Sequence, residues 1–341
     1  MSLVIKIIGA IIILILGLYV YLHFASQKTY PVEYGISFNQ NHAESLDLDW
    51  KVVYEDMLRE LRPSSVRIAA MWNDVEREEE HLGGDHQHIE DEEYNFENVD
   101  WMMDKAKQYN ASVVLVVGQK APRWPECHVP TWHANNTENS EAHLLDYVRA
   151  TVERYKDHEA LEIWQVENEA FIHFTFGECE GYNQDAIYKE IDLVRALDPE
   201  HKILVTDSGE LGLWKKASKA GDLFGTTLYR IVRSPKGNII SYDWIPPAFY
   251  RLKAKAVGVD LDRFIVAELQ AEPWFTDSHP MDTSIEDQEK TMNPKRLTQH
   301  MDFVERIGVS RSYLWGVEWW YFMKEVRGDA RYWDLVTEKL S

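Results

Sequence analysis

Positive charge is scarce in this chain of 341 residues. It has 36 lysines and arginines against 57 aspartates and glutamates, which gives a formal net charge of −21. An acidic body repels polyanions, so nucleic acids and anionic membrane surfaces are unfavourable partners. The composition instead favours a soluble, acidic body with a neutral or cationic ligand.

Four further features are missing from the sequence. No glycine-rich phosphate loop follows the first expected strand, where GISFNQNH (35–42) holds a single glycine. This counts against a dinucleotide-binding, Rossmann-like sheet. No second long apolar run follows the N-terminal one, and neither an internal repeat nor a low-complexity linker is evident. We therefore expect one large folded body after the N-terminal segment.

The N-terminal segment LVIKIIGAIIILILGLYVYLHFA is the longest apolar run, with no charge from Ile7 to Ala25. At about 1.5 Å per helical residue, it nearly spans a hydrocarbon core of roughly 30 Å. Its length and His23, two residues before Ala25, favour an uncleaved signal anchor; a cleaved signal peptide, giving a secreted protein, is the alternative. Lys6 before the span favours a cytoplasmic N-terminus and an exported body. We expect an anchor at 1–25, a linker at 26–32 and a catalytic domain at 33–341.

Short apolar runs alternate with amphipathic stretches of helical period over the rest of the chain. Eight such units predict a parallel α/β fold, a (β/α)8 TIM barrel preceded by one transmembrane helix, with a terminal helix near 330–340. A Rossmann-like sheet is the structural alternative. The expected strands are 34–38, 65–70, 112–118, 161–166, 202–207, 221–229, 263–269 and 310–320.

Two glutamates stand at the carboxyl ends of expected strands. Glu169 closes the fourth in WQVENEAF, and Glu268 follows the run FIVA in the seventh. Chemistry in such barrels takes place where strands end and loops begin, so both side chains can face one pocket. Two opposed carboxyls suit the hydrolysis of a glycosidic bond. One protonates the leaving oxygen, and the other attacks the anomeric carbon or activates a water.

The segment WQVENEA resembles the strand-four signature of the clan A glycoside hydrolases, in which an Asn-Glu pair ends the strand. The pattern SVRIAA (65–70) is similar to that of the cellulase-like, family-five members. The resemblance covers the chain from Tyr34 to about Tyr321. It implies that Glu169 is the acid/base, that Glu268 is the nucleophile and that Asn168 binds the sugar 2-hydroxyl.

The same resemblance implies roles for three more residues. Arg67 in SVRIAA would orient the nucleophile, and Tyr229 in GTTLY would donate a hydrogen bond to it. Trp315 in YLWGVEWW would stack under the reactive sugar.

The loop after the third strand departs from the family pattern. Many cellulase-like members carry a histidine near the sugar there, whereas this chain reads VVGQKAPRWPECH and His128 comes late. We expect Gln119, Lys120, Arg123 or Trp124 to line the pocket instead, with Trp124 taken as a substrate contact. The departure leaves the sugar, the linkage and the choice between internal and terminal cleavage unassigned.

Three other glutamates need an interpretation of their own. Glu272 in AEPW is the alternative nucleophile. Glu167 precedes Asn168 and should face the opposite side of an extended strand, which predicts a structural carboxylate bonded to barrel backbone or to an arginine. Glu318 either contacts the substrate or caps the eighth strand.

The chain has two cysteines, and both are expected in neighbouring loops at the catalytic mouth. Cys127 follows the third strand and Cys179 follows the fourth. In an exported body they can form a disulfide that braces the cleft wall; two free thiols are the alternative.

The sequence thus predicts a membrane-anchored retaining glycoside hydrolase that cleaves a β-glycosidic bond of an oligosaccharide, polysaccharide or glycoconjugate. Its two carboxyls are expected about 5–5.5 Å apart, and no metal or organic cofactor is required. A transglycosylase with the same site and a catalytically inactive glycan-binding barrel remain as alternatives. The acidic stretch 73–98 is expected to be a solvated loop, with a metal site at His81, His86 and His88 as its alternative.

Overall fold

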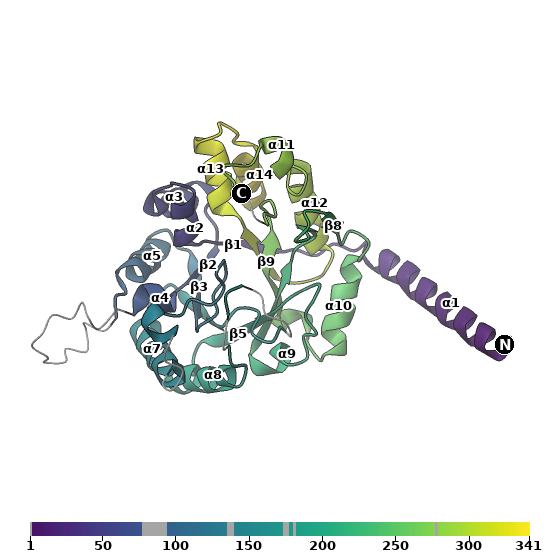
Figure 1. Ribbon diagram of the computed structural model, residues 1–341, viewed down its shortest axis with the longest axis horizontal. Coiled ribbons are helices and arrows are strands. Elements are labelled where there is room, and N and C mark those ends of the chain that lie inside the picture. The colour runs from purple at the N-terminus through teal and green to yellow at the C-terminus, as the bar shows by residue number, and fades with distance from the viewer. Residues whose placement is uncertain (1, 77–93, 135–139, 173–176, 180–181, 277–278) are drawn as a thin grey trace, which may run out of the picture.

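The computed structural model describes residues 2–76, 94–134, 140–172, 177–179, 182–276 and 279–341 (Figure 1). Eight parallel strands close into a barrel in the order β1-β10-β9-β6-β5-β4-β3-β2, which confirms the predicted (β/α)8 fold. The barrel strands are β1 (Glu33–Ser37), β2 (Ser65–Ala69), β3 (Ser112–Val117), β4 (Leu161–Val166), β5 (Lys202–Asp207), β6 (Leu223–Leu228), β9 (Phe264–Gln270) and β10 (Arg311–Trp315). The histidines of the acidic stretch, at 81, 86 and 88, lie outside the described residues.

Helices surround the barrel (Figure 1). Side chains cap several of them: Asp49 accepts a hydrogen bond from the backbone N of Lys51, and Asn293 accepts one from that of Arg296. The helices around the barrel are α2 (Gln40–Ser45), α3 (Trp50–Asp56), α4 (Trp72–Val75), α5 (Glu97–Gln108), α6 (Thr131–Ala134), α7 (Ser140–Tyr155), α8 (Ala186–Leu197), α9 (Ala217–Ala220), α10 (Pro247–Ala256), α11 (Ile285–Gln288), α12 (Pro294–Glu305), α13 (Val317–Glu325) and α14 (Arg331–Leu340), with short turns at Met57–Leu61 and Leu261–Arg263.

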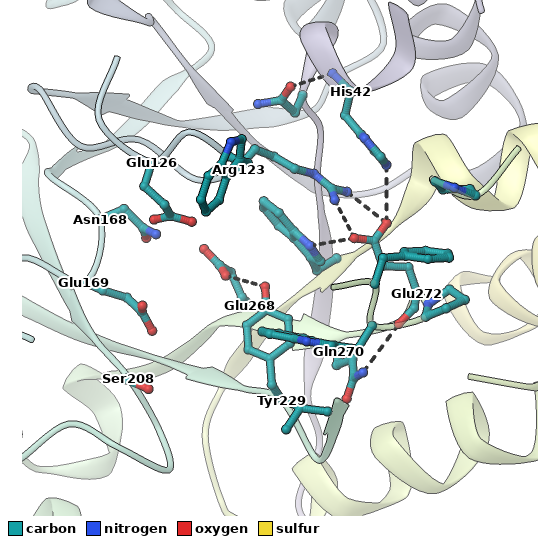
Figure 2. A pocket seen from close by; sticks show the side chains of 18 of the residues that line it. His42, Arg123, Glu126, Asn168, Glu169, Ser208, Tyr229, Glu268, Gln270 and Glu272 are labelled. Carbon is teal, nitrogen blue, oxygen red and sulfur yellow. Dashed lines mark hydrogen bonds and ion pairs between the residues drawn. The ribbon is translucent and has the colours of Figure 1, made fainter. Parts of the chain in front are cut away.

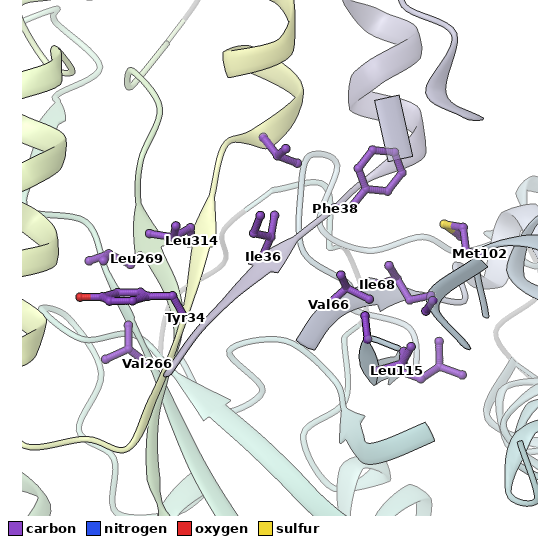
Figure 3. Close-up of a cluster of buried hydrophobic side chains, with 14 of the residues drawn as sticks. Tyr34, Ile36, Phe38, Val66, Ile68, Met102, Leu115, Val266, Leu269 and Leu314 are labelled. Carbon is purple, nitrogen blue, oxygen red and sulfur yellow. The ribbon is translucent and has the colours of Figure 1, made fainter. Parts of the chain in front are cut away.

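Most of the hydrophobic core lies in two clusters, because alternate residues of a barrel strand face inward and outward. On the outside, Ile36, Val66 and Leu115 pack toward the helices, and Met102 of α5 is buried in the same cluster (Figure 3). A second, separate cluster takes one residue from each of six strands: Val114, Ile163, Leu204, Leu223, Ile265 and Tyr313. A small third cluster joins Met71, Val116 and Ala121. The barrel is therefore a packed core, and only its mouth is left for chemistry.

Helix α1 (Ser2–Ala25) projects away from the barrel (Figure 1). Its stretch Leu3–Ala25 is long and apolar enough to cross a membrane, and its most apolar window is not buried by the rest of the protein. At the base of the helix, Arg251 of α10 donates a hydrogen bond to the carbonyl of Ala25 at 2.7 Å. Anchoring of the chain in a membrane by α1 remains a prediction.

The eighth strand is shorter than the sequence pattern predicted. Strand β10 ends at Trp315, and Val317–Glu325 forms helix α13, so the expected strand to residue 320 is wrong. Gly316 separates the two elements with φ of 137°, a backbone conformation that favours glycine. Glu318 consequently lies in the first turn of a helix and does not cap a strand.

Other boundaries differ in smaller ways. Tyr229 lies directly after β6, and Glu268 lies inside β9, which continues to Gln270. An antiparallel pair outside the barrel, β7 (Ile231–Arg233) and β8 (Ile239–Ser241), is absent from the sequence expectations.

Candidate active site

A cavity of about 580 Å³ opens at the carboxyl ends of the barrel strands (Figure 2). This is the end at which the chemistry of such barrels takes place. Its lining comes from the segments that follow the strands, and includes Asn39, Arg123, Trp124, Glu126, Asn168, Glu169, Ser208, Tyr229, Glu268, Glu272 and Trp315.

Glu268 is buried in β9, and both of its carboxyl oxygens have a donor. Arg67 Nη1 donates to Oε1 at 3.0 Å. The Tyr229 hydroxyl donates to Oε2 at 2.8 Å (Figure 2). Arg67 comes from β2 and Tyr229 from the end of β6, so two sides of the barrel fix this side chain. The arrangement holds the carboxylate in one orientation toward the cavity.

Glu169 lies in the turn after β4, at a φ of 44°. Its Oε1 accepts a hydrogen bond from Thr227 Oγ1 at 2.8 Å, and its backbone N donates to Thr206 Oγ1 at 2.8 Å. Burial raises the pKa of the Glu169 carboxyl to about 7; Lys120 opposes that shift and the charge of Glu268 adds to it. A large share of Glu169 is therefore protonated near neutral pH.

A hydrogen-bond network links these two glutamates to the barrel interior. Besides binding Glu268, Arg67 donates to Asn168 Oδ1 at 2.9 Å and to Gln165 Oε1 at 2.7 Å. The hydroxyl of Thr206 also reaches Asn168 Oδ1, at 3.3 Å. The network places Asn168 beside the cavity with its oxygen already engaged.

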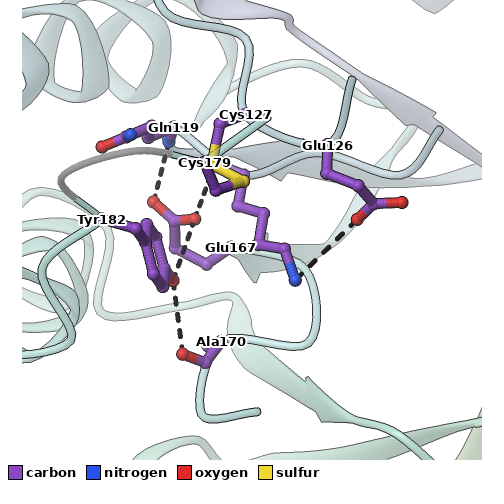
Figure 4. Close-up of a disulfide and its surroundings, with 8 residues drawn as sticks. Gln119, Glu126, Cys127, Glu167, Ala170, Cys179 and Tyr182 are labelled. Atoms are coloured by element: carbon purple, nitrogen blue, oxygen red, sulfur yellow. Dashed lines mark hydrogen bonds and ion pairs between the residues drawn. A yellow bond between two sulfur atoms is a disulfide. The ribbon is translucent and has the colours of Figure 1, made fainter. Parts of the chain in front are cut away.

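Glu167 serves the loop after β3 rather than the cavity. Its carboxylate accepts hydrogen bonds from the backbone N of Gln119 and of Lys120, both at 2.7 Å (Figure 4). Its backbone φ of 60° lies in the left-handed region, so β4 ends in a turn here. Glu167 bonds to backbone, as predicted, but to that of the loop after β3. The extended strand from which this was predicted is wrong, because Glu167 lies in a turn.

Glu272, the alternative nucleophile, is an ion-paired carboxylate. Arg123 forms a bidentate pair with it, at 2.5 Å for Nη1–Oε1 and 2.9 Å for Nη2–Oε2. Trp315 Nε1 donates to Oε1 at 3.1 Å, and His42 Nε2 lies 3.7 Å from Oε2. Burial alone would raise the pKa of Glu272, but Arg123 and His42 lower it to about 2. The pairing suits a permanently charged structural group better than an attacking one.

Trp315 and Glu318 both contact the Arg123 guanidinium. The Trp315 ring centroid lies 4.3 Å from Arg123 Cζ, so the guanidinium covers one face of the ring. Glu318 Oε2 lies 3.3 Å from Arg123 Nη2, and its Oε1 accepts a hydrogen bond from the backbone N of Asn39 at 2.6 Å. Glu318 therefore has two protein partners. The Arg123 guanidinium covers a face of the Trp315 ring, the residue on which a sugar was expected to stack.

Lys120 and Glu126 form a second buried pair beside the catalytic candidates. Lys120 Nζ lies 3.8 Å from Glu126 Oε2. Burial raises the pKa of Glu126 to about 8, with Lys120 opposing the shift. Sequence reasoning missed Glu126 because it lies inside a loop, away from any strand end; Lys120 and Arg123 were foreseen as lining residues only.

Cys127 and Cys179 form a disulfide with a Cα–Cα distance of 5.1 Å (Figure 4). It joins the segment after β3 to the segment after β4. Lys120 and Cys127 also pair across the β3 loop in an antiparallel bridge, which shapes the loop that carries Trp124 and Glu126.

Two groups among the described residues have ligand atoms close enough to hold a metal ion: Glu76 with His133 and His143, and His42 with Glu272 and Glu318. In both groups the carboxylates already have donors. Glu76 accepts from the indoles of Trp72 and Trp132. In the second group the guanidinium of Arg123 supplies the positive charge.

Solved glycoside hydrolases share this fold at low sequence identity. An endoxylanase of family GH10 retrieved from a sugarcane soil metagenome aligns with a TM-score of 0.52 and 15% identity, covering 86% of this chain and 88% of that one. A GH5_18 protein from Streptomyces cattleya, in complex with GlcNAc, aligns with a TM-score of 0.56 and 12% identity, covering 84% and 71%. At such identities the likeness concerns the fold.

Sequence comparisons point to the same class. The family model for glycosyl hydrolase family 10 matches residues 51–210. Mannan endo-1,4-beta-mannosidase F of Aspergillus fumigatus is 32% identical over 82 residues, a segment that covers 23% of this chain and 17% of that protein. The predicted resemblance to clan A glycoside hydrolases is confirmed. The matching family model is that of family 10, whereas the strand-two pattern pointed to family five.

Proposed function

We propose that this chain hydrolyses a β-glycosidic bond with retention of configuration, using Glu268 as the nucleophile and Glu169 as the acid/base. The observation that carries the proposal is the difference between the two carboxyls. Glu268 accepts hydrogen bonds from Arg67 and Tyr229 at both oxygens, which suits an aligned attacking carboxylate. Burial raises the pKa of Glu169 to about 7, which suits a proton donor.

The reaction would take two steps. First, a Glu268 oxygen bonds to the anomeric carbon, the glycosidic bond to the leaving oxygen breaks, and the proton of Glu169 passes to that oxygen. Next, a water gives a proton to Glu169 and its oxygen to the anomeric carbon, while the bond to Glu268 breaks. Both carboxyls return to their starting states. The mechanism requires them to be about 5–5.5 Å apart.

Neighbouring side chains would serve these steps in different ways. Arg67 and Tyr229 would orient the nucleophile, and release of the Tyr229 hydrogen bond would free one oxygen for attack. Asn168, beside Glu169 on the same turn, would bind the sugar 2-hydroxyl. Trp124 is 65% exposed at the rim of the cavity, which suits stacking of a sugar at the entrance. Trp315 and Glu318 would act on the substrate through Arg123.

The substrate would be an oligosaccharide, a polysaccharide or a glycoconjugate outside the cytoplasm. Helix α1 would anchor the chain in a membrane, and the disulfide between Cys127 and Cys179 fits an oxidising compartment. The match to a mannan-cleaving enzyme suggests β-linked hexose chains as the first substrates to test.

Substitution of the nucleophile tests this proposal. We expect Glu268→Gln to lower kcat on the best aryl glycoside about a thousandfold or more, because the covalent step is lost. The exposed Glu159→Gln is the matched control and should behave as the unmodified chain. Proton NMR of the first product formed should show the anomer of the substrate.

Two results would contradict the proposal. Release of the inverted anomer would exclude double displacement. Glycan binding without turnover, unchanged by Glu268→Gln, would favour a binding protein instead.

A further inference from the structure

The ion pair between Arg123 and Glu272 crosses the mouth of the barrel. Arg123 lies in the loop after β3, and Glu272 follows β9. The strand order places β3 and β9 four positions apart in a ring of eight, so they stand on opposite sides of the barrel. Arg123 therefore reaches across the mouth to Glu272 (Figure 2). The other partners of Glu272, His42 and Trp315, belong to the β1 and β10 side of the mouth.

The crossing pair is held rigidly from several directions. The side chains of Arg123 and Glu272 are 15% and 9% exposed. Trp315 lies under the guanidinium and donates to Glu272, while Glu318 accepts a hydrogen bond from Arg123. A bidentate pair of this kind is geometrically specific and stronger than a single hydrogen bond. It is therefore a fixed part of the site.

The position of this pair limits how a sugar chain can lie. The line from β3 to β9 leaves β10, β1 and β2 on one side, and β6, β5 and β4 on the other. Glu169 follows β4 and belongs to the second side, whereas Glu268 lies in β9, at one end of the line. Tyr229, which bonds to Glu268, follows β6 on the second side. A sugar chain that extended from Glu169 and Glu268 toward β10 and β1 would meet Arg123 where it covers the Trp315 ring.

Two further polar groups of the loop after β3 lack a hydrogen-bond partner among the described residues. Lys120 Nζ and Glu126 Oε2 are buried and have no hydrogen-bond partner among the residues that the structure describes. They lie 3.8 Å apart, and Glu126 lines the cavity. Lys120 lies behind Glu126 and does not line the cavity, so a ligand hydroxyl can reach Glu126 only. A hydroxyl that donates to Glu126 would supply the hydrogen bond that this buried carboxylate lacks. The last sugar of a chain carries one more free hydroxyl than an internal sugar.

We infer that this site removes single sugars from chain ends, with the Arg123–Glu272 pair as the closed end of the pocket and Glu126, paired with Lys120 behind it, as the partner of the terminal hydroxyl. The inference rests on the proposed hydrolase activity and narrows its substrate class. It separates this chain from proteins that cleave internal bonds, such as the endoxylanase and endo-mannosidase to which it is similar.

The test compares chain-end with internal cleavage by the full-length protein in mild detergent. One panel contains 4-nitrophenyl β-glycosides of xylose, mannose, glucose, galactose and N-acetylglucosamine. A second panel contains the matching oligosaccharides labelled at the reducing end, together with dye-linked xylan and mannan. We expect one aryl glycoside to be cleaved, the labelled oligosaccharide to shorten one sugar at a time, and no dye to be released.

Substitution of Arg123 tests the pair itself. Arg123→Ala should open the closed end, so that the ratio of internal to terminal cleavage rises about tenfold or more. Arg123→Lys keeps the charge without the bidentate geometry and should give a smaller rise. The control is Arg154→Ala, which breaks another bidentate pair, with Asp100, away from the cavity and should leave the ratio unchanged.

The outcomes separate this inference from the proposed function. Dye release or internal fragments from the unmodified chain would overturn terminal cleavage while leaving hydrolysis standing. An unchanged ratio in a folded Arg123→Lys protein would overturn the role of the pair. Failure on every substrate in both panels would count against the hydrolase itself.

Discussion

Glutamates of one cavity have very different proton affinities because their neighbours differ. Burial raises the pKa of Glu169 to about 7 and that of Glu126 to about 8, whereas Arg123 and His42 hold that of Glu272 near 2. Groups whose pKa values are pushed apart in this way can carry out opposite tasks at a single pH. Glu169 can donate a proton under conditions in which Glu272 stays charged.

The raised pKa of Glu169 predicts a pH profile. The first chemical step needs Glu169 protonated, and this form is lost as pH rises through about 7. We expect kcat/KM on an aryl glycoside with a poor leaving group to fall above that pH. A dinitrophenyl leaving group needs no proton, so Glu169→Ala should still carry out the first step on such a substrate. The fall in kcat/KM above a pH of about 7, the alkaline limb of the profile, should be absent in this variant.

Two variants show which group titrates. Lys120 lowers the pKa of Glu169, so Lys120→Met should move the alkaline limb to higher pH. Glu126→Gln removes a second carboxyl that titrates near this range, and the limb should survive it. If Glu126→Gln abolished the fall in kcat/KM at alkaline pH, the titrating group would be Glu126 and not Glu169.

The sequence placed three residues at strand ends that line one cavity in the structure, while their catalytic and binding roles remain predictions. Glu169, Asn168 and Glu268 follow apolar runs whose ends must meet at one edge of a parallel barrel. Arg123 and Glu272 are 149 residues apart, and no local pattern indicates that they pair. Glu126 is harder still, because its loop is irregular and its burial depends on the disulfide and on the neighbouring turn.

At the scale of elements, the loop after β3 supplies Arg123, Trp124 and Glu126 to the cavity. Its two ends are fixed differently. Glu167 accepts hydrogen bonds from the backbone of residues 119 and 120, and the disulfide ties Cys127 to the loop after β4. The site therefore depends on this loop being held in one conformation.

Removal of the disulfide should weaken both stability and activity. The closed segment between Cys127 and Cys179 spans 52 residues, for which the chain-entropy estimate is about 4 kcal/mol. We expect the double Cys→Ser variant to lose about 2–4 kcal/mol of unfolding free energy in urea. Its kcat/KM should fall as well, because the loop after β3 would lose one of its two attachments. A double variant with unchanged kcat/KM would show that the hydrogen bonds of Glu167 are enough to fix this loop.

The error in the eighth strand has a physical cause. The run VEWWYFM is buried on all sides in α13, so it lacks the alternation of apolar and polar residues that marks an amphipathic helix. Such a run cannot be distinguished from a buried strand by periodicity. The hairpin β7–β8 was missed for the opposite reason, because its second strand is short and exposed.

At the scale of the whole molecule, eight βα units and one apolar helix account for most of the chain. The units were predictable because a parallel barrel buries both faces of its strands, which leaves continuous apolar runs. The sugar was not predictable, because its recognition depends on irregular loops whose side chains meet only in the folded barrel.

Helix α1 predicts how the chain partitions between membrane and solution. We expect the full chain to sediment with membranes and to resist extraction by alkaline carbonate, because an apolar span of this length is stable in hydrocarbon. A variant lacking residues 1–25 should be soluble and keep its activity, since α1 projects away from the barrel (Figure 1) and none of its residues lines the cavity. Recovery of the full chain in the soluble fraction would contradict the anchor.

Covalent labelling tests the central claim most directly. The full chain in detergent would be incubated with 2-fluoro glycosides of several sugars bearing good leaving groups, and its mass and modified peptide would then be determined. The account predicts a mass increase of one 2-fluoro sugar on Glu268, and the sugar that labels would begin to define the substrate. Labelling at Glu272, or no labelling in a protein that turns over glycosides, would contradict Glu268 as the nucleophile.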